Sequence, residues 1–288
     1  MEQLARPLRS VLYIPASKAR ILEKATQLPA DALIFDLEDA VTPEAKVEAR
    51  KALVHALDIH DYGTRYKIIR INGLDTEWGR EDAQLVAQSG ADAVLLPKVN
   101  TPDDLDALVE IVGENVPLWA MMETCQGILN AASIVSHNRL QGCVAGTNDL
   151  ASELGCACDQ NRSALQMGLQ TIVMAARSAG LVAIDGVYNK FNDQEGLRLE
   201  CEQGLALGYD GKSLIHPAQL AITNAIFAPS TDAIELARRQ IEAFDEIERT
   251  GQGVAVVDGH IVANLHVASA RRLIKLVEMI NAAASYKE

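Results

Sequence analysis

Aromatic side chains, basic charge and long apolar runs are all scarce in this sequence of 288 residues. Phe, Trp and Tyr together make up only 4% of the chain, so its core must be aliphatic. The 26 Lys and Arg residues are outnumbered by 39 Asp and Glu, for a formal net charge of −13. This balance argues against nucleic acid as the main partner, because phosphate binding needs a basic surface. No apolar run approaches the ~20 residues that span a bilayer, so no membrane segment is expected.

Cysteine is also sparse. The five cysteines are odd in number and scattered, which argues against a disulfide framework and indicates thiols in a reducing compartment. Cys156 and Cys158 form a C-x-C pair, but no second pair follows at zinc-site spacing, so we interpret them as loop cysteines. The N-terminal segment has only a short apolar stretch and no small-residue cleavage site. We therefore expect a cytoplasmic protein.

Apolar, β-branched runs of strand length recur along the chain, and several are apolar nearly throughout, as strands of parallel sheets are. Helical stretches with apolar residues three and four apart lie between them. Eight strands alternating with helices predict an α/β fold, a (β/α)8 TIM barrel. A doubly wound sheet is the alternative, but no G-x-G-x-x-G follows the first run. The predicted strands are residues 10–15, 31–39, 66–72, 92–98, 117–124, 140–149, 181–188 and 209–217.

The chain beyond the eighth strand is too long for one closing helix. We divide the sequence into a barrel over residues 1–226 and a C-terminal extension over residues 227–288. The pattern of the extension predicts a helix over 232–249, a short strand over 254–259 and a last helix over 267–284. We expect this helix–strand–helix segment to be an appendage on the barrel.

Polar side chains gather at the ends of the predicted strands, where a barrel of this kind places its active site. Each one alone has an ordinary structural explanation, such as a helix cap, a solvated charge or a packed histidine. So many polar residues at the ends of consecutive strands favour a functional site over these separate structural explanations. Its members are Tyr13, Ser17, Asp36, Glu38, Asp39, Arg70, Asn72, Lys98, Glu123, Asn148, Asp149, Asp185 and His216.

Glu123 and Asp149 follow successive predicted strands, so their carboxylates should be neighbours. Two carboxylates with little else are typical of Mg²⁺ completed by waters and substrate oxygens, and no histidine or cysteine cluster suggests zinc. The alternative is an acid/base pair as in glycosidases. Arg70 argues against that, since a guanidinium beside a metal suits a small carboxylate or keto acid rather than a neutral sugar.

The first 24 residues are basic, unlike the rest of the chain. A stretch that enters a helix, PASKARILEK, carries several of these cations. Its amides and cations could hold phosphates, or it could be an ordinary basic helix face. The spacing alone does not decide between the two.

Several motifs together resemble the citrate lyase β-chain / malyl-CoA lyase family of the HpcH/HpaI aldolase/citrate lyase superfamily. The motifs are RSVLYIPASKARILEKA, DALIFDLEDAVTPEAKVEAR, IIRINGLDTEWG, LLPKV, METCQGI, GTNDLASELG, AIDGVY and LGYDGKSLIHPAQ. The resemblance runs from about Arg9 to the C-terminus. It implies a (β/α)8 barrel, usually a homotrimer, that handles CoA thioesters with Mg²⁺.

The resemblance also implies roles for individual residues. Glu123 and Asp149 match the family's metal ligands, and Arg70 matches the arginine that binds the keto acid or carboxylate. The predicted catalytic residues are Arg70, Glu38 and Asp39. The predicted substrate and CoA contacts are Tyr13, Arg20, Lys24, Arg70, Glu123, Asn148, Ile215 and His216.

The implied chemistry is a retro-Claisen cleavage of a β-hydroxyacyl-CoA to an acyl-CoA and a 2-keto acid. Many members carry an aspartate in a C-terminal lid, donated to a neighbouring subunit, as the acid/base for the enolate carbon. In this chain the corresponding segment is residues 257–266, and the aspartate position is Ala263. An alanine cannot transfer a proton. Either a nearby group such as Asp258, His260 or His266 replaces it, or the activity is altered, for example to thioester hydrolysis.

Three hypotheses follow from this resemblance and from the alanine at the position of the lid aspartate. We favour a Mg²⁺-dependent carbon–carbon lyase for a citramalyl-CoA- or malyl-CoA-like substrate. A thioesterase for malyl-CoA-like esters is the second hypothesis. The third is a citrate lyase β-subunit that acts on a citryl group bound to an acyl carrier protein.

Overall fold

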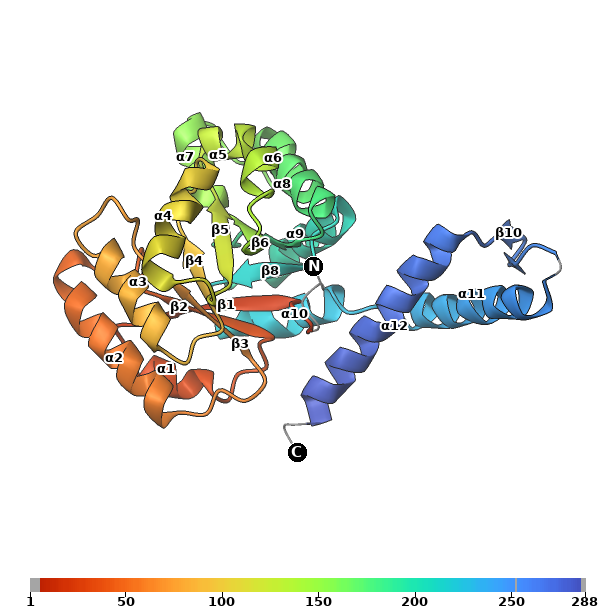
Figure 1. Ribbon diagram of the computed structural model, residues 1–288, viewed down its shortest axis with the longest axis horizontal. Coiled ribbons are helices and arrows are strands. Elements are labelled where there is room, and N and C mark those ends of the chain that lie inside the picture. The colour runs from red at the N-terminus through yellow and green to blue at the C-terminus, as the bar shows by residue number, and fades with distance from the viewer. Residues whose placement is uncertain (1–5, 252, 286–288) are drawn as a thin grey trace. The chain divides into compact units, whose positions relative to one another are not determined.

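The computed structural model describes residues 6–251 and 253–285 of the chain. It divides into two compact units, one over Leu8–Phe227 and one that begins at Ala228. Figure 1 shows the first unit as a ring of helices around strands and the second as two long helices. Among the described residues, no helix is both long and apolar enough to cross a membrane.

The first unit is a closed barrel of eight parallel strands. Each strand pairs with the next along the chain, and β8 closes the ring by pairing with β1. This confirms the predicted (β/α)8 fold. The strands are β1 (Ser10–Pro15), β2 (Ala32–Asp36), β3 (Tyr66–Arg70), β4 (Ala93–Leu96), β5 (Leu118–Met122), β6 (Leu140–Ala145), β7 (Val182–Asp185) and β8 (Gly211–Leu214).

Several strands end earlier than the sequence predicts, and polar side chains cause one of these endings. The run over residues 31–39 stops being a strand at Asp36. The Asp36 carboxylate accepts hydrogen bonds from the backbone N–H groups of Glu38 and Ala40, at 2.9 and 3.0 Å. A side chain that binds the backbone two and four residues ahead turns the chain away from the sheet. Glu38 and Asp39 therefore lie in a loop at the mouth of the barrel.

Helices follow most of the strands and cover the outside of the barrel (Figure 1). Short 3₁₀ turns precede three of them, at Pro43–Ala45, Ser163–Leu165 and Pro217–Gln219. The helices of this unit are α1 (Ala19–Ala25), α2 (Lys46–Ile59), α3 (Gly79–Gln88), α4 (Pro102–Val112), α5 (Cys125–Leu129), α6 (Ala131–Ile134), α7 (Thr147–Leu154), α8 (Gln166–Ser178), α9 (Gln194–Leu207) and α10 (Leu220–Ile226).

The strands are apolar on both faces because they separate two cores. Ile34, Ile68 and Trp119 point into the barrel, whereas Phe35 and Ile69 pack outward against helices, and all five are fully buried. The Trp119 ring fills the space beside Gly142, where an added Cβ would lie only 2.6 Å from it. This double burial explains why the sequence shows continuous apolar runs instead of alternation.

The second unit consists of two helices joined by a short two-stranded antiparallel sheet. Helices α11 (Thr231–Thr250) and α12 (Asn264–Ser285) flank two short antiparallel strands, β9 (Val256–Val257) and β10 (His260–Ile261). The sequence predicted one strand here. Two strands form because Asp258 and Gly259 both have positive φ, 50° and 78°, which is the backbone of a tight hairpin turn.

Candidate active site

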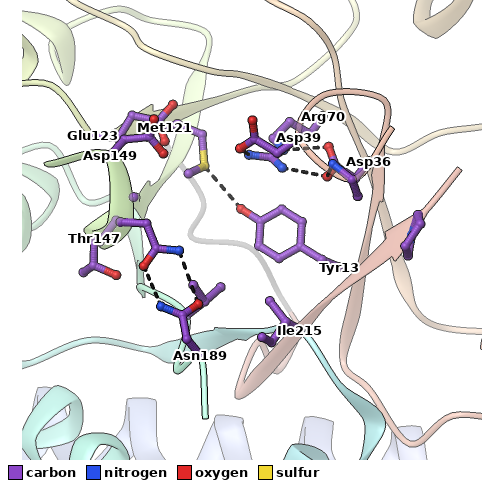
Figure 2. Close-up of a pocket in the computed structure, with 16 residues that line it drawn as sticks. Tyr13, Asp36, Asp39, Arg70, Met121, Glu123, Thr147, Asp149, Asn189 and Ile215 are labelled. Atoms are coloured by element: carbon purple, nitrogen blue, oxygen red, sulfur yellow. Dashed lines mark hydrogen bonds and ion pairs between the residues drawn. The ribbon is translucent and has the colours of Figure 1, made fainter. Parts of the chain in front are cut away.

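A cavity of about 290 Å³ opens at the carboxyl ends of the barrel strands (Figure 2). Seven of the eight strands or the loops that follow them contribute to its wall, as expected for a barrel of this type. The lining residues are Tyr13, Pro15, Asp36, Asp39, Ala40, Arg70, Met121, Glu123, Ala145, Gly146, Thr147, Asn148, Asp149, Val187, Asn189 and Ile215. The structure thus brings together eight of the residues that the sequence assigned to a site, from Tyr13 to Ile215.

Arg70, the last residue of β3, is held by a group of carboxylates. Its Nε and Nη2 donate to the two carboxylate oxygens of Asp36 at 2.7 and 2.6 Å. Its Nη1 lies 2.7 Å from Glu38 Oε2 and 3.3 Å from Asp39 Oδ2. The guanidinium also stacks 4.9 Å from the centre of the Tyr13 ring. Such bidentate pairing fixes the plane of the guanidinium at the cavity wall.

Glu38 does not line the cavity but supports the residues that do. Its side chain is only 11% exposed and lies between the cations of Arg70 and Lys98. Burial is the main cause that raises its pKa above the ordinary range. We therefore interpret Glu38 as an anchor for Arg70 as well as a candidate catalytic carboxylate.

Glu123 follows β5 and is almost fully buried, with 2% of its surface exposed. Its Oε1 accepts a hydrogen bond from the backbone N–H of Lys98 at 2.8 Å. Gly146 makes room for the carboxylate, because a Cβ there would lie 2.3 Å from Glu123 Oε2. Burial, together with the negative charges of Glu38 and Asp149, raises the pKa of Glu123 to about 7.

Lys98 lies in the loop after β4. Its backbone has a φ of 51°, a value that residues other than glycine rarely adopt. Its Nζ lies 3.5 Å from Glu38 Oε1 and 3.9 Å from Asp149 Oδ1. Although partial burial opposes it, the charges of Glu38 and Asp149 raise the pKa of Lys98. The lysine is therefore a cation that faces the acidic wall of the cavity.

The charges around the cavity fit a divalent cation. Among the described residues, five carboxylates (Asp36, Glu38, Asp39, Glu123 and Asp149) lie at or beside the cavity, against the three cations Arg70, Lys98 and Lys46. Burial first, and then the negative charges of Glu38 and Asp149, raise the pKa of Glu123, and a bound cation would offset that repulsion. No cluster of three or more His, Cys, Asp or Glu side chains able to hold a metal occurs in the described ranges. Glu123 and Asp149 alone suit Mg²⁺, which is bound through one or two carboxylates and keeps several waters or substrate oxygens.

Asn189 is a cavity residue that the sequence did not single out. It pairs with Asn148 through two hydrogen bonds: Asn189 Nδ2 donates to Asn148 Oδ1 at 2.7 Å, and Asn148 Nδ2 donates to Asn189 Oδ1 at 3.3 Å. Figure 2 shows Asn189 on the wall of the cavity, below Asp149 in this view. Asn189 lies four residues beyond the end of β7, in a loop with no periodic pattern, so only its amide side chain could have drawn notice.

Three predicted contact residues lie outside the cavity wall. Arg20 and Lys24 are exposed on α1. His216 is also exposed; its Nδ1 accepts the Ala218 N–H at 3.2 Å, and its ring stacks on Phe191 with 4.6 Å between centres. These contacts give His216 a structural role in capping the turn after β8.

Ala263 and its neighbours belong to the second unit. The backbone N–H of Ala263 donates to His266 Nδ1 at 3.0 Å, just before α12. Asp258 is paired with Arg239 on α11, with Nη2 and Oδ2 2.9 Å apart. Two of the three candidate replacements for the lid aspartate, Asp258 and His266, therefore already have partners within their own unit.

An arginine and paired carboxylates at the strand ends of a (β/α)8 barrel suit a small carboxylic acid held together with a metal ion. Residues 9–217 match the family model described as HpcH/HpaI aldolase/citrate lyase. The chain belongs to this family, which confirms the resemblance found in the sequence.

Three relatives illustrate the range of the family. The chain is 58% identical to a (3S)-malyl-CoA thioesterase of Cereibacter sphaeroides over 98% of this chain and 99% of the relative. It is 35% identical to citrate lyase subunit beta of Escherichia coli over 96% of each chain. It is 33% identical to an L-malyl-CoA/beta-methylmalyl-CoA lyase of Cereibacter sphaeroides over 96% of this chain and 97% of the relative.

A solved structure also matches nearly the whole chain. This is the protein CitE from Mycobacterium tuberculosis in complex with magnesium, acetoacetate and coenzyme A. It is 26% identical, with a TM-score of 0.78, over 96% of this chain and 99% of that one. Family relatives thus bind magnesium and coenzyme A, and the family includes CoA-ester lyases and thioesterases.

Proposed function

We propose that this protein hydrolyses a malyl-CoA-type thioester in a Mg²⁺-dependent reaction. The observation that carries the proposal is Ala263, which stands at the position where the resemblance implies that many family members carry the aspartate that protonates the enolate carbon. Hydrolysis forms no enolate and needs no such acid. The 58% identity to (3S)-malyl-CoA thioesterases supports the same choice.

The sequence on its own favoured carbon–carbon cleavage, and that activity remains the second candidate. The 33% identity to a malyl-CoA lyase supports it, because the cavity carboxylates and Arg70 serve both reactions. A β-subunit role is the third candidate and rests on the 35% identity to citrate lyase subunit beta. That role needs an acyl carrier protein as partner.

The cavity residues bind the acid end of the substrate in this proposal. Glu123 and Asp149 would hold Mg²⁺, which when bound supplies positive charge to the substrate's carboxylate and hydroxyl oxygens. Arg70, oriented by Asp36, pairs with the same carboxylate. We expect the exposed cations of Arg20 and Lys24 to attract the phosphates of CoA.

The hydrolytic step requires a base for water, and Asp39 is the candidate we assign. Its side chain is 63% exposed and lines the cavity, whereas Glu38 is largely buried against Arg70. Asp39 takes a proton from water as the water oxygen bonds to the thioester carbonyl carbon. The C–S bond then breaks, and the CoA thiolate leaves and receives a proton. The products are a dicarboxylic hydroxy acid and free CoA.

A two-channel assay tests the proposal on the purified chain with malyl-CoA and Mg²⁺. One channel follows free CoA thiol and the other follows keto acid. We expect thiol without keto acid, and loss of turnover in EDTA. Keto acid in equal amount to the substrate consumed would establish the lyase instead.

The metal assignment has its own variant. Asp149→Asn removes one of the two proposed ligand charges and should abolish Mg²⁺-dependent turnover. Asp58→Asn is the matched control, since Asp58 is exposed on α2 outside the cavity wall. Full activity in Asp149→Asn would overturn the assignment.

The predicted homotrimer and cytoplasmic location remain proposals. Analytical ultracentrifugation tests the first, and cell fractionation tests the second.

A further inference from the structure

The amide pair of Asn148 and Asn189 presents unused donors to the cavity. Each carboxamide carries two N–H bonds. One N–H of each is used in the reciprocal pair, at 2.7 and 3.3 Å, and neither Nδ2 makes another hydrogen bond within the described part of the chain. Both residues line the cavity. The pair therefore has two N–H groups left, one on each amide, that can donate a hydrogen bond to a ligand oxygen.

The loop that carries Asn189 is held in place by its neighbours. The Tyr188 carbonyl accepts a hydrogen bond from Nε2 of Gln219 at 2.9 Å, and Gln219 is fully buried. Gln219 Oε1 in turn accepts the backbone N–H of Ile215 at 3.0 Å, so the loops after β7 and β8 are joined. The Tyr188 hydroxyl donates to Asp193 Oδ2 at 2.7 Å. Donors fixed in this way need no rearrangement when a substrate binds.

The pair lies at a suitable point along the substrate. In a malyl-type thioester, one methylene separates the hydroxyl-bearing carbon from the thioester carbonyl. Asn148 and Asp149 are consecutive residues in the first turn of α7, and both line the cavity. Arg70, Glu123, Asp149 and both amides line the same cavity, so a substrate whose carboxylate and hydroxyl bind at the first three would have its thioester carbonyl in the cavity that the amides also line.

We propose that Asn189, oriented by Asn148, donates a hydrogen bond to the thioester carbonyl oxygen and stabilises the negative charge that forms on it. The inference rests on the proposed function, because it requires a CoA thioester in this cavity. As the water oxygen bonds to the carbonyl carbon, the π electron pair moves to the carbonyl oxygen, and it returns when the C–S bond breaks. Asn189 keeps its proton throughout.

The test compares Asn189→Ala with Asn192→Ala. Asn192 is exposed in the same loop but does not line the cavity, so it is a matched control. Loss of one such donor lowers kcat about a hundredfold, and we expect this for Asn189→Ala with little change in KM. Asn189→Asp has the same shape without the donor and should be at least as impaired.

A second measurement separates this role from a structural one. Mg²⁺ and malate, which lacks the thioester, should bind Asn189→Ala with wild-type affinity in calorimetry. An Asn189→Ala enzyme with wild-type kcat would overturn the inference, and so would a loss of malate binding that matches the loss of kcat. A wild-type chain that releases neither thiol nor keto acid from malyl-CoA would instead overturn the proposed function, and this inference with it.

Discussion

At the scale of single residues, Glu123 links metal binding to pH. Its pKa in the metal-free protein is raised to about 7 by burial and by nearby carboxylates, against an ordinary value of 4.5. A proton on Glu123 must leave before a cation binds, so metal affinity should rise with pH up to about 7 and level off above it.

The same shift predicts how Mg²⁺ changes stability with pH. Because the folded-state pKa lies above the unfolded one, Glu123 stabilises the metal-free protein below pH 4.5. That contribution is lost as the pH rises through about 7. We expect Mg²⁺ to raise the melting temperature more at pH 8 than at pH 6, which thermal scans with and without the ion measure. An equal effect at both values would contradict the placement of Glu123 as a ligand.

At the scale of elements, the turn between β6 and α7 sets the position of Glu123. Gly146→Ala adds a Cβ 2.3 Å from the Glu123 Cβ and Oε2, so the carboxylate must move. We expect Mg²⁺ affinity to fall at least tenfold, with an overpacking cost of about 1–3 kcal/mol in unfolding free energy. Gly90→Ala is the control, because its Cβ meets nothing within 4 Å. Calorimetric titration measures the Mg²⁺ affinity of both variants. Equal affinities would show that the turn does not position Glu123.

The segment before α12 offers a gain-of-function prediction. Ala263→Asp restores the acid that lyases of the family carry, so keto-acid release should appear or increase. Ala282→Asp places the same charge at an exposed position on α12 and should not change the products. Keto-acid release is measured by coupling to a dehydrogenase. If neither variant releases keto acid, the missing aspartate is not what separates the two activities.

Sequence reasoning reached the barrel but not all of the local detail. The eight strands were predictable because burial on both faces leaves continuous apolar runs. The end of β2 was not, because it depends on Asp36 binding backbone groups ahead of it. The hairpin at Asp258 was read as one strand, since positive φ values leave little trace in the hydrophobic pattern. Asn189 was not predicted as a site residue because its place in the site depends on its hydrogen bonds with Asn148, which lies 41 residues earlier in the chain.

At the scale of the whole barrel, a buried ion network joins strands to a helix. Lys212 of β8 is fully buried, with its Nζ 3.0 Å from Asp185 Oδ2 and 2.7 Å from Glu200 Oε1 on α9. Arg162 Nη1 also pairs with Asp185, at 2.7 Å. The two cations and two carboxylates balance one another, so removing one leaves a buried charge unpaired.

Lys212→Met should therefore lower the unfolding free energy by about 3–5 kcal/mol. Lys51→Met is the control, because the Lys51 side chain is 68% exposed on α2 and its ion pair with Glu48 contributes little. Urea denaturation followed by circular dichroism measures both. A Lys212→Met variant as stable as the control would mean that the network does not hold α9 to the barrel.

The central claim for the whole molecule is that the thioester bond breaks while the carbon–carbon bond survives. Mass spectrometry of the products formed from malyl-CoA and Mg²⁺ in ¹⁸O-labelled water tests it directly. The account predicts free CoA and malate with one ¹⁸O atom in the carboxyl group derived from the thioester. Acetyl-CoA together with glyoxylate would contradict it.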